Sequence, residues 1–326
     1  MEINEQSEEK QEATLPFNNL FLNAGFVNGY NKRWMYVCGI LASIFGYFIC
    51  QIFLLVPLIA SGFKMGISFH EMQTNPEILF DPDKIGFNKN VLLAMLFSMF
   101  VFALFGLYII VKKIHQKPFK SLITAYDNIR YKRFFFAFMV WAIFIIIITI
   151  VQYFLNKESF TLQFKPFDFF ILLVICVVLL PIQTSTEEII FRGYLMQGMS
   201  QFFKNGITPL IITSLLFGYV HMNNPEAKTY GWEVMLPYYS LFGFFLGAIT
   251  LLDEGLELAL GIHCANNLIT GLLVTSPNGV LKTDSIFAVS AENPAGELFT
   301  WLIIASLTFI IFWRKYRWKN FTLLIK

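Results

Sequence analysis

Long uninterrupted apolar runs constrain this chain more than any other feature. One run covers roughly residues 34–60, and comparable runs recur along the 326-residue chain. A segment of ~20 apolar residues spans a bilayer as a helix, because a helix satisfies all its backbone polar groups internally. The chain is 56% hydrophobic and only 14% charged, whereas soluble domains carry about 25% charged residues. We therefore predict an all-α, polytopic integral membrane protein.

The apolar runs predict about eight transmembrane helices. The fourth run is too long for one span and contains Pro181, which kinks or breaks a helix. It is either one long kinked helix that protrudes from the membrane, or a short span followed by a separate helix. We favour the long helix, because residues 204–206 then form a turn. The expected spans are residues 34–60, 91–111, 134–155, 167–203, 207–221, 236–252, 256–275 and 296–313.

These spans divide the chain into four parts. Residues 1–33 are a polar N-terminal lead-in, whose acidic start lacks the pattern of a signal peptide. Residues 34–160 hold the N-terminal transmembrane helices, with a polar connection at residues 61–90. Residues 161–275 form a helical core that carries most of the unusual polar residues, and residues 276–326 hold the last helix and a basic tail.

The distribution of Lys and Arg predicts the orientation. Basic residues cluster in the connection at residues 112–133 and after the last span, at residues 314–319. Short loops rich in Lys and Arg stay in the cytoplasm. We therefore expect cytoplasmic N- and C-termini in a bacterial inner or plasma membrane. The sequence has no nucleic-acid-binding feature, and its four cysteines lie in apolar stretches without a metal-knuckle or disulfide spacing.

Two adjacent carboxylates and an arginine lie inside the fourth apolar run. An ionisable side chain in a bilayer costs ~2.5–3.5 kcal/mol on insertion scales, so such a group is read as functional. Glu188 and Arg192 are four residues apart and can pair on one helix face. Glu187 points about 100° away from Glu188. We expect Glu187 to remain unpaired and available for chemistry.

Two of the four histidines also lie in apolar runs. His70 and His115 fall in connections, whereas His221 ends the fifth run and His263 lies inside the seventh. Helical rise places Glu187 and His221 ~25 and ~22 Å from the turn at residues 204–206, but His263 only ~12 Å from the next turn. The three side chains meet if residues 197–204 project about two turns beyond the membrane surface.

A carboxylate and two imidazoles suit two kinds of hydrolytic chemistry, and the residues alone leave both open. Glu187 can act as general base towards a water. Alternatively, Glu187, His221 and His263 ligate a divalent metal, zinc first, that acidifies the water. Asn267 shares a helix face with His263 and can donate to an oxyanion, or simply bond a neighbouring helix.

Three short motifs in separate apolar helices resemble the signature of the CPBP family, which groups CAAX prenyl endopeptidases with bacteriocin-processing and Abi immunity proteins. They are the Glu187-Glu188-x-x-x-Arg192, Phe217-x-x-x-His221 and His263-x-x-x-Asn267 motifs, in the family order. The resemblance covers roughly residues 165–275 and implies intramembrane proteolysis of a membrane protein or peptide, with or without a metal.

The resemblance implies specific roles for these residues and leaves rival functions. Glu187, His221, His263 and Asn267 match catalytic positions, and Glu188, Arg192 and Phe217 match supporting ones. A non-proteolytic immunity or scaffold protein with the same fold would use the polar set for helix packing. An ion or proton transporter would place polar groups along a path across the bilayer, yet the first three spans are nearly free of ionisable residues.

Overall fold

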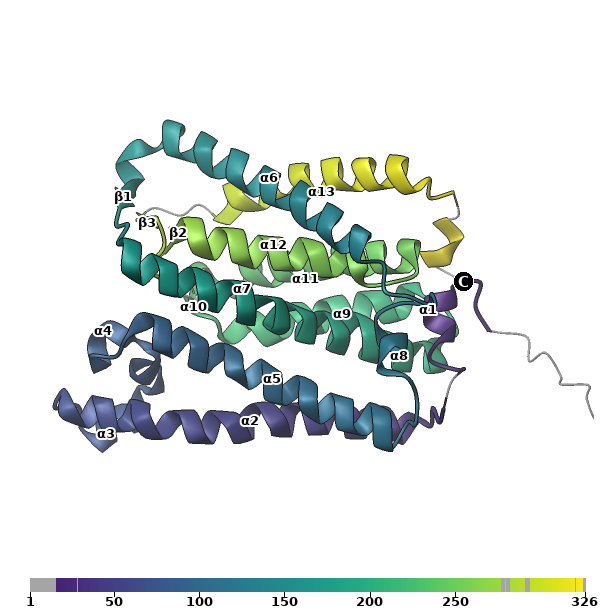
Figure 1. The fold of residues 1–326 in the computed structure, drawn as a ribbon, viewed down its shortest axis with the longest axis horizontal. Coiled ribbons are helices and arrows are strands. Elements are labelled where there is room, and N and C mark those ends of the chain that lie inside the picture. The colour runs from purple at the N-terminus through teal and green to yellow at the C-terminus, as the bar shows by residue number, and fades with distance from the viewer. Residues whose placement is uncertain are drawn as a thin grey trace, which may run out of the picture.

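The computed structural model shows the all-α protein that the sequence predicts. It describes residues 16–27, 29–276, 279, 282–290, 294–319 and 321–324. Long helices lie side by side in a bundle, with three short strands near one end (Figure 1). The acidic start of the expected lead-in, residues 1–12, lies outside the described residues.

Each expected span corresponds to a helix. Among the described residues, six helical segments are long and apolar enough to cross a membrane. The fifth and seventh spans form shorter helices of 14 and 17 residues. The protein is therefore a multi-pass membrane protein. The helices are α2 (Arg33–Lys64), α5 (Lys89–Lys113), α6 (Tyr131–Leu155), α7 (Pro166–Glu188), α9 (Ile207–Val220), α11 (Trp232–Asp253), α12 (Glu257–Leu273) and α13 (Pro294–Tyr316).

Short elements connect these helices. The short α-helices are α1 (Leu20–Asn23), α3 (Phe69–Thr74), α4 (Pro82–Ile85), α8 (Met196–Phe203) and α10 (Pro225–Tyr230). Single 3₁₀ turns occupy Pro76–Phe80, Phe119–Leu122, Lys157–Ser159, His221–Asn223 and Phe321–Leu324. The strands are β1 (Phe160–Leu162), β2 (Val274–Thr275) and β3 (Phe287–Val289).

The fourth expected span is one continuous helical segment, Pro166–Phe203, as we favoured. Pro181 does not break the helix, because α7 continues through this residue. The irregular part is a π-helical segment, Ile189–Leu195, between α7 and α8. A π-helical turn holds more residues than an α-helical turn, and such turns are frequent at functional sites. This π-helical segment begins directly after the adjacent carboxylates Glu187 and Glu188.

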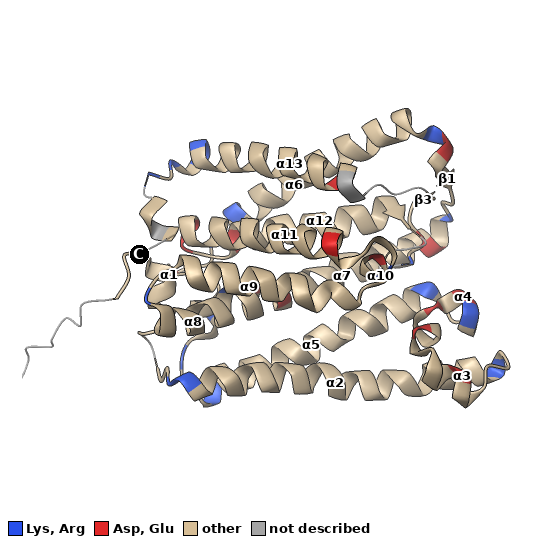
Figure 2. Ribbon diagram, turned by 180° about the vertical axis from the view of Figure 1, so that it is seen from behind, with Lys and Arg blue, Asp and Glu red and all other residues tan. Residues whose placement is uncertain are grey.

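Charged residues gather at the two ends of the bundle and are sparse in its middle (Figure 2). We call the end that carries the connection at residues 114–130 and the C-terminus the basic end. The opposite end, which carries the three strands, is the sheet end (Figure 1). In the sheet, β3 pairs with β1 antiparallel and with β2 parallel. The sheet thereby joins the segment before α7 to the end of α12.

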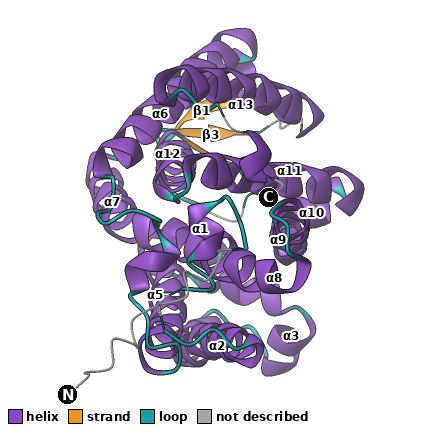
Figure 3. Ribbon diagram, turned by 90° about the vertical axis from the view of Figure 1, so that its right-hand side faces the viewer, coloured by secondary structure: helices purple, strands orange, loops and turns teal. Residues whose placement is uncertain are grey.

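Helix α12 lies at the centre of the half of the bundle that contains the three motifs. It packs against α6, α7 and α11, which surround it in an end-on view (Figure 3). Close packing with α6 depends on Gly261, where a Cβ atom would collide with the carbonyl oxygen of Phe134. Small residues allow such close approach between membrane helices. His263, two residues later, is therefore held on a rigid element.

The basic end is more enclosed than the sequence suggests. Asn19, Phe21 and Leu22 of the expected lead-in are buried, so this part is packed inside the protein. Gln197 is fully buried and donates to the carbonyl oxygen of Ser121. The start of this segment is thus packed against the 114–130 connection, whereas residues 202–204 are exposed, and its projection beyond the membrane surface stays a prediction.

The turn between α11 and α12 also lies beneath the 114–130 connection. Thr124 forms a β-bridge with Gly255, and the Leu256 amide donates to the carbonyl oxygen of Ile123. Leu256 is fully buried. Helix α12 therefore begins below this covering connection, which removes the apparent mismatch in depth between His263 and the other site residues.

A cluster of ion pairs fixes this turn. Arg130 donates to both carboxylate oxygens of Glu257, at 3.0 and 2.6 Å, and lies 3.0 Å from Asp253. Arg133 pairs with the same Asp253 carboxylate. Both acidic residues are buried, and breaking a buried pair typically costs 3–5 kcal/mol. The cluster therefore locks α6 to α11 and α12.

Candidate active site

The expected pair in the first motif forms at the junction of α7 and the π-helical segment. Arg192 Nη1 donates to Glu188 Oε1 at 2.8 Å, and both side chains are fully buried. The guanidinium also lies over the ring of Phe217, with its Cζ atom 4.3 Å from the ring centroid. A Cβ atom at Gly243 would stand only 3.0 Å from Arg192 Nη2, so glycine makes room for the arginine.

Glu188 also accepts a hydrogen bond from the third motif. His263 Nδ1 lies 2.7 Å from Glu188 Oε1, the same oxygen that Arg192 contacts. A carboxylate can only accept, so Nδ1 carries the proton and donates. This contact fixes the imidazole tautomer and leaves Nε2 as an acceptor in the neutral ring. Glu188 thus joins α7 to α12, a role that its position in the sequence does not predict.

Glu187 is less free than the sequence suggests. Its Oε1 accepts from Gln183 Nε2 at 2.5 Å, one helical turn earlier on α7. Its Oε2 lies 3.6 Å from His263 Nε2 and is buried without a hydrogen-bond partner among the described residues. The expectation that Glu187 lacks a protein partner is therefore wrong for one oxygen. The other oxygen remains available.

The unpaired oxygen of Glu187 and the unprotonated nitrogen of His263 are both acceptors. Two acceptors 3.6 Å apart can both lie within hydrogen-bond distance of one water, which has two protons to donate. A water held in this way directs its lone pairs away from both groups. The geometry can therefore orient a water as a nucleophile.

Asn267 lies beside this pair, on the face of α12 that carries His263. Its Nδ2 donates to Gln183 Oε1 at 3.3 Å and stands 3.5 Å from His263 Nε2. The second distance is at the limit of a hydrogen bond, so one N–H can turn towards a new acceptor. Asn266 donates to Asn267 Oδ1 at 3.1 Å and accepts from Trp141 at 3.1 Å.

His221 contacts the same phenylalanine ring as His263. The Phe217 centroid lies 4.5 Å from that of His221 and 6.1 Å from that of His263, so the expected Phe217–His221 packing forms. His221 Nδ1 faces the Phe217 carbonyl oxygen at 2.6 Å and must donate to it. Tyr239 stacks on the imidazole at a centroid distance of 4.4 Å. The ring is thus clamped, with Nε2 left for other contacts.

The residues do not form a ready metal site in this arrangement. Carboxylate and imidazole groups are suitable zinc ligands. However, among the described residues no three His, Cys, Asp or Glu side chains are grouped closely enough to hold a metal ion. The chemistry of Glu187, His221 and His263 fits a metal, whereas their spacing does not.

The three motifs alone do not identify several residues of the site. Gln183 precedes Glu187 by four residues, a helical spacing that predicts this contact. Tyr239 and Trp141 come from α11 and α6 and give no local signal. His115, which falls in a connection between predicted spans, is fully buried, and its Nε2 lies 2.9 Å from the Tyr194 hydroxyl in the π-helical segment.

Two buried basic residues in the 114–130 connection support the π-helical segment. Burial, together with the nearby Lys117 charge, lowers the pKa of His115 to about 4. Burial also lowers the pKa of Lys117 to about 8. Tyr194 donates to the carbonyl oxygen of Met35 at 2.8 Å, which ties the segment to α2. Neutral His115 is therefore part of the packing at pH 7.

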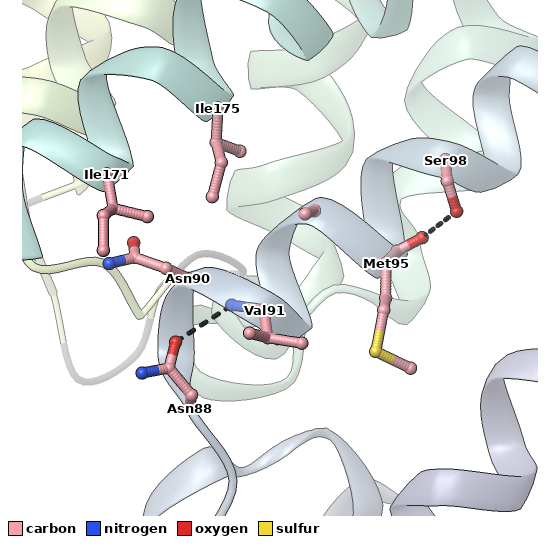
Figure 4. Close-up of a pocket in the computed structure, with 8 residues that line it drawn as sticks. Asn88, Asn90, Val91, Met95, Ser98, Ile171 and Ile175 are labelled. Atoms are coloured by element: carbon pink, nitrogen blue, oxygen red, sulfur yellow. Dashed lines mark hydrogen bonds between the residues drawn. The ribbon is translucent and has the colours of Figure 1, made fainter.

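A surface groove between α5 and α7 does not contain these residues. It has a volume of about 450 Å³ and opens between α5 and α7 towards the sheet end. Figure 4 shows Asn88 and Asn90 near Ile171 and Ile175 along its walls. Glu187 lies twelve residues beyond Ile175 on the same helix, or ~18 Å along its axis. The candidate site is therefore defined by its side chains and not by this groove.

Comparisons with known proteins bear on the same region. Residues 166–269 match the family model described as type II CAAX prenyl endopeptidase Rce1-like. The match confirms, over this part of the chain, the resemblance to the CPBP family that the three motifs indicate. It contains all three motifs and ends two residues after Asn267.

A relative extends the similarity to most of the chain. The uncharacterized protein YyaK of Bacillus subtilis (strain 168) is 29% identical over 276 residues, which is 84% of this chain and 89% of YyaK. No solved structure matches. The chain is thus a multi-pass membrane protein whose residues 166–269 are similar to the type II CAAX prenyl endopeptidase Rce1-like family.

Proposed function

We propose that the protein is an intramembrane endopeptidase that hydrolyses a peptide bond of a membrane protein or peptide with a glutamate-activated water. The observation that carries this proposal is the buried, unpartnered Oε2 atom of Glu187, 3.6 Å from His263 Nε2. A carboxylate oxygen left unsatisfied inside a protein is costly and calls for a partner. A water between the two groups supplies that partner and is the nucleophile.

The first chemical step uses the carboxylate as a general base. Glu187 Oε2 takes a proton from the water while the water oxygen attacks the carbonyl carbon of the scissile peptide bond. The C=O double bond becomes a C–O⁻ single bond in the tetrahedral intermediate. One N–H of Asn267 turns to this oxyanion, and such a donor is worth about 10²–10³-fold in rate.

Collapse of the intermediate returns the proton. The carboxylic acid of Glu187 protonates the leaving nitrogen as the C–N bond breaks, which releases an amine and a carboxylic acid. The acid then passes its proton to the amine, so that the products are a carboxylate and an ammonium group. Glu188 holds His263 through Nδ1 and is itself paired with Arg192. His221, clamped by Tyr239, offers Nε2 as an acceptor for a substrate N–H.

The pairing pattern favours this enzyme over a scaffold. A scaffold that used these groups only for packing would leave few of them unsatisfied. Here Glu187 Oε2, Glu188 Oε2 and two guanidinium nitrogens of Arg192 are buried without hydrogen-bond partners among the described residues. Of these atoms, Glu187 Oε2 lies beside His263 Nε2, where the proposed water would bind.

The direct test maps new protein ends. Membranes from Bacillus cells that lack the relative YyaK are incubated with the purified wild-type protein or with buffer, and new N-termini are quantified by mass spectrometry. We expect a small set of new N-termini in or next to apolar segments. A quenched fluorogenic peptide built on the strongest of them then serves as the substrate. If no N-terminus depends on the protein, the proposal is wrong.

We also propose that the basic end and both termini face the cytoplasm of a bacterial plasma membrane. In a Cys38→Ser background, cysteines placed at the exposed residues Lys120 and Lys319 should resist a membrane-impermeant thiol reagent in intact cells and react after lysis. A cysteine at Glu71 on the sheet end is the matched control and should react in intact cells. The reverse pattern would invert the orientation.

We propose that catalysis needs no metal, since the three candidate ligands are not grouped for one. Activity on the fluorogenic peptide should survive strong chelators, and zinc should stay below one equivalent per protein. The opposite result would be loss of activity on chelation and recovery with zinc in the wild type. Parallel loss of bound zinc in His221→Ala and His263→Ala would then assign these ligands.

A further inference from the structure

We infer that a one-way chain of hydrogen bonds, which begins at Trp141 outside the matched domain, positions the carboxylate of Glu187 for catalysis. The inference deepens the proposed function and rests on it for the role of Glu187. Trp141 lies on α6 and is fully buried, whereas the family match begins only at residue 166. Trp141, Asn266 and Gln183 are positioning residues in this chain.

The chain has four links that cross from α6 to α12 and then to α7. Trp141 Nε1 donates to Asn266 Oδ1 at 3.1 Å, and Asn266 Nδ2 donates to Asn267 Oδ1 at 3.1 Å. Asn267 Nδ2 then donates to Gln183 Oε1 at 3.3 Å. Gln183 Nε2 finally donates to Glu187 Oε1 at 2.5 Å. Every link therefore donates in the direction of Glu187.

The chemistry of the two end groups fixes this direction. An amide side chain can be turned over, because its oxygen and nitrogen have similar shapes. An indole N–H, however, can only donate, and a carboxylate can only accept. Between such ends, each of Asn266, Asn267 and Gln183 has a single orientation that makes both of its bonds. The direction thus follows from the residue types and does not depend on an arbitrary amide assignment.

The chain has a consequence for the reactivity of Glu187. Aligned hydrogen bonds polarise one another, so the last donor holds Oε1 more firmly than an isolated amide would. This donor occupies Oε1 only. The carboxylate of Glu187 is therefore oriented through Oε1, while Oε2 stays open for the proposed water.

The first test removes the starting donor with little change in shape. Trp141→Phe keeps an aromatic ring on Phe245 but leaves the amides free to turn over. We expect kcat for the fluorogenic peptide to fall about fivefold, with KM unchanged, since one hydrogen bond contributes about 1 kcal/mol. The acidic limb of the rate–pH profile should move as well, because the base is held less firmly.

A second buried tryptophan provides the matched control. Trp301 also packs on Phe245, with a centroid distance of 5.8 Å against 5.9 Å for Trp141. Its Nε1 is buried without a hydrogen-bond partner among the described residues. Trp301→Phe removes the same atoms without touching the chain and should leave kcat and the pH profile unchanged. Equal behaviour of the two variants would overturn the inference.

A spectroscopic test does not depend on activity. In ¹⁵N-tryptophan-labelled protein in detergent, the indole N–H signals of Trp141 and Trp301 are assigned by their loss in the Phe variants. Glu187→Ala should shift the Trp141 signal upfield, because the chain loses its terminal acceptor, and leave that of Trp301 in place. An unmoved Trp141 signal would refute the chain. Full cleavage activity in Glu187→Ala would instead refute the proposed function, whatever the spectrum shows.

Discussion

Replacement of Glu187 by alanine should abolish cleavage while the protein remains folded and membrane-inserted. General base catalysis contributes about 10²–10⁴-fold, so the rate on the fluorogenic peptide should fall by at least about a hundredfold. The loss should appear in kcat, because the carboxylate acts on the water and not on substrate binding. Folding should survive, since Glu187 contacts Gln183 and His263 but forms no ion pair with Arg192.

Two measurements check this prediction. Thermal unfolding in detergent should give Glu187→Ala a midpoint close to that of the wild type. Glu71→Ala, which changes an exposed glutamate in α3, should retain full activity. A wild-type cleavage rate in purified Glu187→Ala protein would rule out the glutamate–water mechanism.

Replacement of Arg192 by alanine should affect abundance more than any other single change in the site. It leaves Glu188 buried without its cation, and breaking a buried pair costs about 3–5 kcal/mol. This penalty is a large share of the stability of an ordinary protein domain. We expect much less folded protein in the membrane, measured as the monodisperse fraction after detergent extraction.

The compensating variant separates loss of charge from loss of pairing. Glu188→Gln combined with Arg192→Gln removes both charges, and the new amide oxygen at position 188 can still accept from His263 Nδ1. Folded protein should therefore recover in part. Arg314→Ala, an exposed arginine in the last turn of α13, is the control and should express normally. Equal yields of Arg192→Ala and the double variant would contradict the pairing.

The features that the sequence predicts correctly depend on residue spacing within one helix or on the surrounding bilayer. Apolar runs predict the helices because a bilayer leaves the backbone no alternative. The four-residue spacing predicts the Glu188–Arg192 pair and the shared face of His263 and Asn267. The same rule could have predicted the contact of Gln183 with Glu187. These predictions need no knowledge of which helices are neighbours.

The remaining features depend on tertiary packing. Nothing near Glu188 indicates that His263, 75 residues later, shares its Oε1 atom with Arg192. The estimate of depth needed an added assumption for a related reason. It placed both turns at the surface, whereas the 114–130 connection covers the turn that precedes α12.

The pairing of α6 with α12 also constrains how the protein can be made. A ribosome completes α6 about a hundred residues before it reaches α12, while α2 and α5 emerge together and can pack as a hairpin. During that interval Arg130 has no Glu257, and Trp141 has no Asn266. Helix α6 must therefore insert into the membrane because it is apolar. Until α12 is made, the face of α6 that later packs on α12 has no partner. Assembly of the proposed active site therefore waits for α12, so a chain truncated before α12 should not cleave membrane proteins.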